Sequence, residues 1–289
     1  MSETTVGRWF RLWMRRSPAL RSVVRSPPVQ ALITTAREAR AVRESLPYAR
    51  RELSSGGAAS YRLRESGLCV TLRHRTRDVD ILREIFAGGP GGHCYEPPPE
   101  VTRALAETPT PRVLDLGGNI GLFGAWVCGR WPGARITSYE PDPGNARLLA
   151  RTIAVNGLGP RWDVVEAAVA TSSGQTAFAA GEFADSHIAD DPDEPAITVP
   201  TVDMFELDHS VDLLKMDIEG GEWPILASSR LPSLRARFLL LEWHGPRRKQ
   251  PGPAHEVVVR RLREVGYEQI QEAGRDYEDD VGVLWAWRP

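Results

Sequence analysis

The chain has 289 residues, of which 42% are hydrophobic and 26% charged, enough for one large globular domain with an extension. Its formal net charge of -2 gives no general reason to expect nucleic-acid binding. The three cysteines, Cys69, Cys94 and Cys128, include no C-x-x-C pair, which argues against a disulfide framework or a zinc site. We expect them to be reduced thiols in a cytoplasmic protein.

The sequence carries no recognisable membrane or export signal. No uncharged apolar run approaches the roughly 18 residues that a membrane-spanning helix needs. Arginines interrupt the apolar N-terminal residues and no small-residue cleavage site follows them, so a signal peptide is not expected. Both observations agree with a cytoplasmic location.

Residues 1–53 are predicted to form a basic, arginine-rich helical extension, because they hold eleven arginines against four glutamates. One amphipathic helix is expected within residues 6–16, where Trp9 and Trp13 share a face, and a second over residues 29–46. Two interpretations are open for this extension. Its aromatic face docks on its own domain or on a second copy of the chain, or its basic helices adhere to an anionic membrane surface.

The stretch Ser54-Ser55-Gly56-Gly57-Ala58 has the composition of a linker and marks the predicted start of a main domain over residues 54–289. A hairpin and two short helices are expected before the main sheet begins. Their predicted bounds are Tyr61–Leu63 and Leu68–Leu72 for the hairpin, and Asp78–Phe86 and Val101–Glu107 for the helices.

From residue 113 onward, short apolar strands alternate with helical stretches, which predicts a doubly wound α/β fold with a mostly parallel sheet. The last two strands are joined by a turn, so we expect an antiparallel C-terminal edge. The predicted strands and extended segments are Val113–Leu116, Arg135–Tyr139, Trp162–Ala168, Gln175–Ala180, Ile197–Pro200, Val211–Met216, Phe238–Trp243, Tyr267–Ile270 and Val281–Trp287. The predicted helices are Leu122–Val127, Asn145–Asn156, Val202–Glu206 and Ala254–Val265.

A glycine-rich turn joins the first of these strands to its helix. Gly117, Gly118 and Gly121 permit a tight turn and a close approach of a ligand to the backbone, and Asn119 tolerates a left-handed conformation. Open α/β folds bind nucleotides at such a turn. The spacing Asp-x-Gly-x-Asn-x-Gly from Asp115 does not fit the dinucleotide pattern G-x-G-x-x-G and is similar to the loop of class I methyltransferases. The alternative is an ordinary strand-to-helix turn.

The ends of the next two strands supply further candidate nucleotide-binding residues. Glu140 lies about twenty residues past the glycine-rich turn, where an acidic residue accepts hydrogen bonds from ribose hydroxyls. Pro141 fixes the following turn and Asn145 opens the next helix. Ala167 falls where an adenine ring lies in such folds, and its small side chain leaves room for the ring. The alternative for Glu140 is a solvated loop carboxylate.

Carboxylates gather after the fourth parallel strand and at the end of the fifth. Asp217 and Glu219 follow the former, and Glu242 and His244 share one face of the latter. Burying carboxylates together is costly unless they are paired, hydrogen-bonded or bound to a cation. Asp217, Glu219 and His244 are therefore candidate catalytic residues, with His244 or Asp217 as the base that takes a proton from an alcohol. Alternatively, Asp217 and Glu242 bind Mg²⁺, or the turn is solvated and Glu219 and Glu222 cap a helix.

Together these motifs resemble the FkbM-type methyltransferases, a class I family that depends on S-adenosylmethionine. The resemblance covers roughly residues 75–245 and implies a seven-stranded class I methyltransferase fold. It also implies methyl transfer to a hydroxyl of a small molecule, such as a natural product, sugar or glycoconjugate, in a biosynthetic pathway. The matching segments are Thr76–Val79, Leu82–Phe86, Asp115–Gly121, Tyr139–Pro141, Val199–Asp203 and, most specifically, Leu214–Glu222.

The resemblance implies roles for individual residues as well. Asp115, Gly117 and Asn119 would line the methionine part of S-adenosylmethionine, Glu140 would hold its ribose, and the carboxylates after the fourth strand would face the reacting centre. The chain departs from the family pattern in two places. Gly221 stands where a small or acidic residue is usual, and the basic extension lies outside the common core, so the resemblance implies nothing about it.

Three other functions are disfavoured by the sequence without being excluded. An NAD-dependent oxidoreductase lacks support because the third glycine and a Tyr-x-x-x-Lys pair are both missing. A nucleic-acid methyltransferase lacks an Asn/Asp-Pro-Pro-aromatic segment and a Pro-Cys nucleophile, and the main domain is acidic. A non-catalytic scaffold with a methyltransferase fold does not explain the intact set of acidic residues.

Overall fold

The computed structural model describes residues 26–87, 94–180, 187–188, 195–245, 254–276 and 281–288. The helix predicted within residues 6–16 lies outside the described residues, as does most of the segment 182–194. Within the described ranges, no helix combines the length and the apolar character that crossing a membrane requires.

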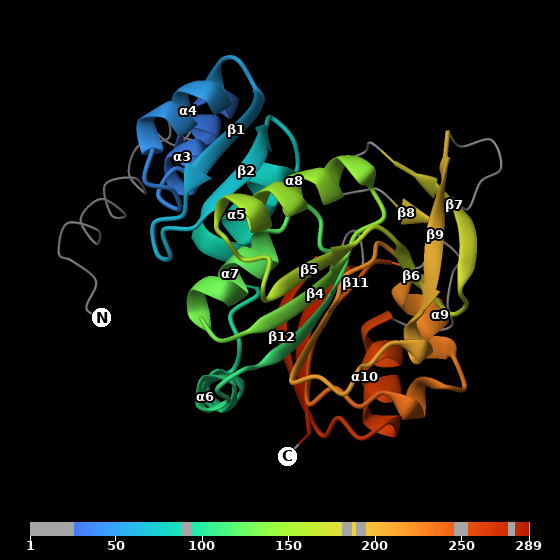
Figure 1. Cartoon of the computed structure of the whole chain (residues 1–289). Helices are drawn as coiled ribbons and strands as arrows, with labels where there is room; N and C mark the ends of the chain where they lie inside the picture. Colours follow the sequence, from blue (N-terminus) through green and yellow to red (C-terminus); the bar gives the residue numbers. More distant parts are fainter. Residues whose placement is uncertain are drawn as a thin grey trace.

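A seven-stranded sheet forms the centre of the fold, with the strand order β12-β13-β11-β10-β3-β4-β5 (Figure 1). Five strands of this sheet are parallel to one another, namely β3, β4, β5, β10 and β11. Strand β13 runs antiparallel to both of its neighbours. This arrangement confirms the predicted class I methyltransferase-like fold and its antiparallel edge. The strands are β3 (Arg112–Leu116), β4 (Arg135–Tyr139), β5 (Trp162–Val165), β10 (Leu213–Met216), β11 (Phe238–Trp243), β12 (Gln269–Asp276) and β13 (Val281–Trp287).

Helices cover both faces of this sheet because its strands are apolar on both sides. Val113, Leu213 and Leu240 belong to the core on one face, whereas Leu114 and Leu214 belong to the core on the other. The first face is covered by α6 (Pro99–Glu107), α7 (Leu122–Arg130) and α8 (Pro143–Val155), and the second by α9 (Glu222–Ala227) and α10 (Ala254–Glu264).

A second, four-stranded sheet stands beside the end of the main one, in the order β6-β9-β7-β8 (Figure 1). It corrects two predictions. The strand expected over Trp162–Ala168 is divided between the two sheets, and the helix expected over Val202–Glu206 is only a 3-10 turn after β9. The strands are β6 (Ala168–Ala170), β7 (Gly174–Ala179), β8 (His187–Ile188) and β9 (Ile197–Asp203), and the turn is Met204–Glu206.

Pairing between distant segments explains both differences. Ala168, Val169 and Ala170 pair in parallel with the last three residues of β9, which draws them away from β5 and keeps Val202 extended. The side chain of Asp203 then accepts a hydrogen bond from the Phe205 amide at 3.0 Å and so starts the 3-10 turn.

The described part of the N-terminal extension contains two helices where the sequence predicts one over residues 29–46. Residues 39–44 leave the helical path because they pair with the first hairpin strand: the Arg43 amide donates to the Arg62 carbonyl at 2.8 Å, and Glu44 accepts from the Arg62 amide at 2.9 Å. The elements are α3 (Pro27–Glu38), α4 (Ser45–Leu53), β1 (Gly57–Arg62), β2 (Cys69–His74), α5 (Asp78–Leu82) and a π-helical turn over Arg83–Ala87.

The hairpin predicted between residues 61 and 72 is confirmed as the antiparallel pair β1-β2, which packs beside α8 (Figure 1). The Asn156 side chain, just after α8, binds both the amide and the carbonyl of Cys69. The hydrophobic core that includes Val42 and Tyr48 is continuous with the core under α7 and α8. The described extension therefore packs on the sheet domain.

Candidate functional site

A cavity of about 540 Å³ opens at the carboxyl ends of β3, β4 and β10. Seven of the predicted cofactor-binding residues lie in its wall, although they come from four separate segments of the chain. These seven are Gly117, Asn119, Glu140, Pro141, Asn145, Ala167 and Asp217. The remaining wall residues are Tyr139, Ala168, Val169, Phe178, Ile188, Ile218 and Glu219. Asp115, Gly118 and Gly121, which were also predicted to bind the cofactor, are not part of this wall.

The glycines of the β3-α7 turn pack against two other parts of the protein, the end of β10 and α8. Gly117 has a φ of +78°, and a Cβ atom there would lie 1.8 Å from the backbone carbonyl oxygen of Asp217. At Gly118 a Cβ would lie 2.8 Å from Leu149, and at Gly121 it would lie 3.1 Å from Leu149 as well. Close packing inside the protein therefore requires these glycines, whether or not a ligand approaches them.

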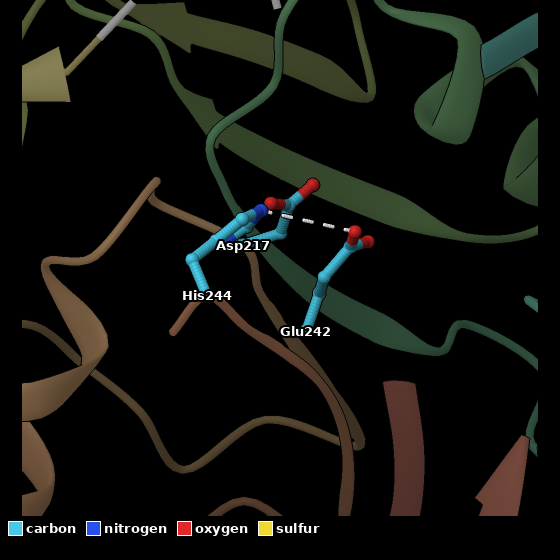
Figure 2. Close-up of side chains that lie close together, drawn as sticks. All are labelled: Asp217, Glu242 and His244. Atoms are coloured by element: carbon cyan, nitrogen blue, oxygen red, sulfur yellow. Dashed lines mark ion pairs between the residues drawn. The ribbon is translucent and has the colours of Figure 1, made fainter. Parts of the chain in front are cut away.

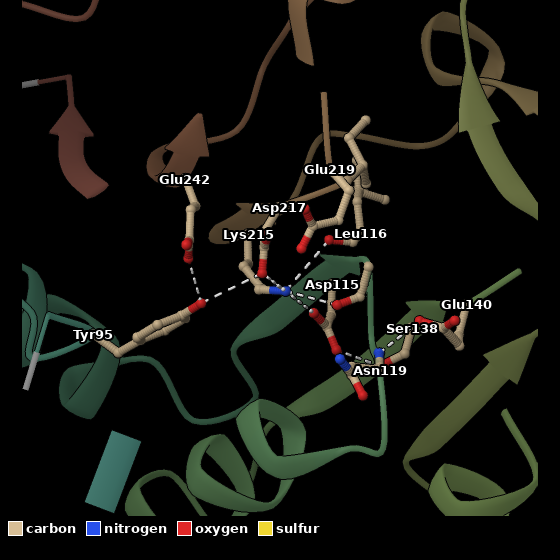
Figure 3. A network of polar contacts seen from close by, with 12 residues as sticks. Tyr95, Asp115, Leu116, Asn119, Ser138, Glu140, Lys215, Asp217, Glu219 and Glu242 are labelled. Atoms are coloured by element: carbon tan, nitrogen blue, oxygen red, sulfur yellow. Dashed lines mark hydrogen bonds and ion pairs between the residues drawn. The ribbon is translucent and has the colours of Figure 1, made fainter. Parts of the chain in front are cut away.

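Glu140 is buried at the end of β4 and its carboxylate is held by donors from both sides (Figure 3). Oε2 accepts from the Asn119 amide at 2.7 Å, and Oε1 accepts from the Asp142 amide at 2.9 Å. Burial nevertheless raises the pKa of Glu140 to about 7, since these hydrogen bonds only partly offset the loss of solvent. The glycine-rich turn and the acidic residue after β4 are thus directly connected.

Asn145 is also buried, one turn into α8, and extends this connection to the N-terminal hairpin. Asp142 caps α8 by accepting from the amides of Gly144 and Asn145. The Asn145 side-chain oxygen accepts from Arg73 at 2.7 Å. Arg73 in turn donates to Asp78 at 2.8 Å, so the hairpin braces the rim of the cavity.

Lys215 lies at the centre of the site, although sequence analysis gave it no role (Figure 3). Its buried Nζ donates to the Gly117 carbonyl at 2.7 Å and lies 3.1 Å from Oδ2 of Asp217 and 3.6 Å from Oδ1 of Asp115. The carboxylates raise the pKa of Lys215, which therefore stays charged despite its burial. The available signal was composition, because Lys215 is one of two lysines in a chain whose other basic residues are arginines.

The loop after β10 is fixed by Glu222 at the start of α9. The buried Glu222 carboxylate accepts from the amides of Ile218 and Gly220, at 2.7 and 2.9 Å. Between them Glu219 has a φ of +53°, a left-handed conformation that costs energy in a residue other than glycine. This conformation brings its carboxylate to 3.3 Å from Nε2 of His244.

His244 follows β11 and is surrounded by acidic groups. Glu222 lies 3.6 Å from Nδ1, and Glu242 lies 3.9 Å from Nε2. Burial alone would lower the pKa of His244, but Glu222, Glu219 and Asp217 raise it to about 10. The three predicted catalytic residues, His244, Asp217 and Glu219, are therefore brought together, and Glu242 lies among them.

Tyr95 and Glu84 complete a second cavity of about 600 Å³ that adjoins the first. The Tyr95 hydroxyl donates to Glu242 at 2.8 Å and also lies 3.4 Å from Oδ2 of Asp217. Burial raises the pKa of Glu84 to about 7 and that of Glu242 to about 8. Neither Tyr95 nor Glu84 was predicted, because each comes from a segment far from the strand ends in sequence. The two cavities share Gly117, Asn119, Asp217 and Glu219.

Comparison with known proteins assigns this site to a family. The profile of the FkbM methyltransferase domain matches residues 115–268, more than half of the chain. The chain belongs to the FkbM methyltransferase domain family. The matched range contains Asp115, Glu140, Lys215 and the β10 and β11 strand ends, whereas Tyr95 and Glu84 precede it.

Individual proteins resemble this FkbM methyltransferase domain either over a short segment or at low sequence identity. The methyltransferase sdnD of Sordaria araneosa is 30% identical over 95 residues, which cover 32% of each chain, so the match spans about a third of that curated relative. The methyltransferase FkbM of Methylobacillus flagellatus is 14% identical, with a TM-score of 0.44 over 90% of this chain and 59% of that one. TYW2 of P. horikoshii, solved with MeSAdo, is 13% identical, with a TM-score of 0.40 over 78% of this chain and 69% of that one.

Proposed function

We propose that this protein transfers a methyl group from S-adenosylmethionine to a hydroxyl oxygen of a small molecule. The observation that carries the proposal is the joining of two cavities at one sheet edge. One has the turn after β3 and Glu140 in its wall, and the other is lined by carboxylates around Tyr95. Membership of the FkbM methyltransferase domain family supports the methyl transfer. The small-molecule acceptor and a role in a biosynthetic pathway are further parts of this proposal.

The first cavity suits the parts of S-adenosylmethionine. Glu140 would accept hydrogen bonds from the ribose hydroxyls, because a carboxylate has acceptor capacity beyond the donors it already binds. Ala167, Phe178 and Ile188 form an apolar wall for the adenine ring. Asp217 and Glu219 border both cavities, where their negative charges would stabilise the sulfonium cation.

The second cavity would hold the acceptor. In the transfer, the acceptor oxygen attacks the methyl carbon, the carbon–sulfur bond breaks, and S-adenosylhomocysteine leaves as a neutral thioether. The hydroxyl proton passes to a base. His244 is poorly suited to this role at neutral pH because its raised pKa keeps it protonated. Glu219 lies in the wall of both cavities, between the donor and the acceptor, so we assign the proton to Glu219. The residues otherwise align the oxygen behind the methyl group and exclude water.

Calorimetric titration of the purified chain with S-adenosylmethionine tests the cofactor assignment. We expect micromolar binding that falls at least tenfold in Glu140→Ala and is unchanged in Glu166→Ala, which removes an exposed carboxylate near the same cavity. Binding of NAD instead of S-adenosylmethionine would make the protein a dehydrogenase, and binding of neither would leave a scaffold. Mass spectrometry of products from a panel of hydroxyl and amino compounds tests the atom that is methylated, and methylation only at nitrogen would refute transfer to oxygen.

A further inference from the structure

Three side chains in the second cavity point toward one another from two adjacent strands (Figure 2). Asp217 follows β10, whereas Glu242 lies in β11 and His244 comes just after it. One ligand atom from each of the three lies within 4.8 Å of the other two. Such a spacing needs only small side-chain movements to surround one ion, because ligands of a single metal are about 3 to 4 Å apart when each bond is about 2.1 Å long.

Each of these side chains also has a close polar neighbour that can orient it. Tyr95 donates to Oε2 of Glu242, while Oε1 of the same carboxylate is the atom nearest Nε2 of His244. Lys215 lies 3.1 Å from Oδ2 of Asp217. The buried Glu222 faces Nδ1 of His244 and so directs Nε2 toward the cavity. Partners of this kind fix ligand atoms around metal ions in proteins.

Among the described residues, the wall of the second cavity carries more carboxyl groups than basic side chains. Four carboxyl groups and three basic side chains line it: Glu84, Asp217, Glu219 and Glu242, against Arg77, Lys215 and His244. Lys215 also faces Asp115 and His244 also faces Glu222, both fully buried. Three basic side chains therefore face six carboxyl groups among the described residues, so a bound cation would stabilise the ionised carboxylates.

We infer that Asp217, Glu242 and His244 form a binding site for one divalent transition-metal ion. Carboxylate oxygens alone would suit Mg²⁺, which the sequence suggested, but an imidazole nitrogen in the set favours Mn²⁺ or Zn²⁺. Binding of the ion does not depend on the proposed function. Its role does: an acceptor hydroxyl on the ion would have a lowered pKa and would lose its proton to Glu219 as the oxygen–carbon bond forms. The ion keeps its valence throughout.

Electron paramagnetic resonance of the full chain, stripped of metal by dialysis and titrated with Mn²⁺, tests this site. We expect one bound Mn²⁺ per chain, with a nitrogen coupling in the spectrum that is lost in His244→Gln. Asp217→Asn and Glu242→Gln should weaken binding by at least 100-fold, and Tyr95→Phe by about 10- to 100-fold. The matched control is His255→Gln, which alters another histidine beside a carboxylate, 3.2 Å from Glu272. It should bind Mn²⁺ like the unaltered chain.

Titration of the same samples with S-adenosylmethionine separates this inference from the proposed function. A chain that binds S-adenosylmethionine but no Mn²⁺ or Zn²⁺ refutes the metal site alone. The metal site is also refuted if Tyr95→Phe and His244→Gln both bind Mn²⁺ as tightly as the unaltered chain does, since the ion would then lie elsewhere. Tyr95→Phe removes one hydroxyl and keeps the ring against Phe123, so it reports on the site even if a ligand variant does not fold.

Discussion

Replacing Gly117 by alanine tests how the two halves of the site are held together. The new Cβ would lie 1.8 Å from the Asp217 carbonyl oxygen, so the β3-α7 turn and the end of β10 must separate by more than 1 Å. That movement would disturb the bond from Lys215 to the Gly117 carbonyl, which is 2.7 Å long.

The expected loss of stability has two parts. A φ of +78° costs an alanine about 1 to 2 kcal/mol, and overpacking adds about 1 to 3 kcal/mol. Gly157→Ala is the matched control, because Gly157 also has a positive φ, +64°, but no atom lies within 4 Å of its Cβ position. We therefore expect Gly117→Ala to lose about 1 to 3 kcal/mol more than Gly157→Ala.

Urea denaturation followed by circular dichroism measures both free energies of unfolding, and calorimetry measures the affinity for S-adenosylmethionine. We expect that affinity to fall at least tenfold in Gly117→Ala and to stay unchanged in Gly157→Ala. Equal destabilisation of the two variants, together with unaltered binding by Gly117→Ala, would show that the contact between Gly117 and Asp217 does not constrain the site.

Three further perturbations follow from buried groups. The raised pKa of Glu140, about 7, means that the folded state binds the proton of this carboxyl more tightly than the unfolded state does. As pH rises from about 5 to 8, the unfolding free energy of the wild type should therefore fall relative to that of Glu140→Gln. Parallel pH profiles of the two proteins in urea denaturation would contradict this. Lys215→Met leaves the buried Asp115 and the half-buried Asp217 without their cation and should cost about 3 to 5 kcal/mol in the same assay. A loss below about 1 kcal/mol would show that Lys215 does not hold these two carboxylates together. Gly124→Ala puts a Cβ 2.1 Å from Trp162, so it should lose about 1 to 3 kcal/mol of unfolding free energy despite the helix preference for alanine. In the control Gly159→Ala the new Cβ meets no atom within 4 Å, so the unfolding free energy should change little. A larger loss in Gly159→Ala than in Gly124→Ala would refute the packing argument.

Local patterns were sufficient to predict the main sheet. Apolar runs such as Val113–Leu116 and Phe238–Trp243 are short, buried on both faces and separated by helical stretches, so their order along the chain already specifies a parallel sheet. The same reasoning placed Glu140 and Asp217 at one edge, since parallel strands all end there. Their cofactor-binding roles stay predictions, as do the catalytic roles of Glu219 and His244.

Pairings between distant segments defeated the other element predictions. Residues 39–44 have helical character by composition, yet they pair with β1 and divide the predicted helix in two. Residues 168–170 continue the apolar run of β5, but their partner is β9, more than thirty residues later. Local sequence patterns do not reveal these pairings, because the backbone hydrogen bonds between strands can form whatever the side chains are.

The amino-acid sequence by itself determined the succession of strands and helices along the chain, the glycine-rich turn and the edge at which the acidic residues gather. Only the tertiary structure decided what surrounds those residues: that Gly117 packs against the Asp217 carbonyl, that Lys215 links two strands, and that Tyr95 reaches Glu242 from 147 positions away. The physical reason is the separation along the chain over which each effect acts. Periodicity and turn chemistry act over a few neighbouring residues, whereas burial of charge and close contact depend on which segments meet after the chain has folded.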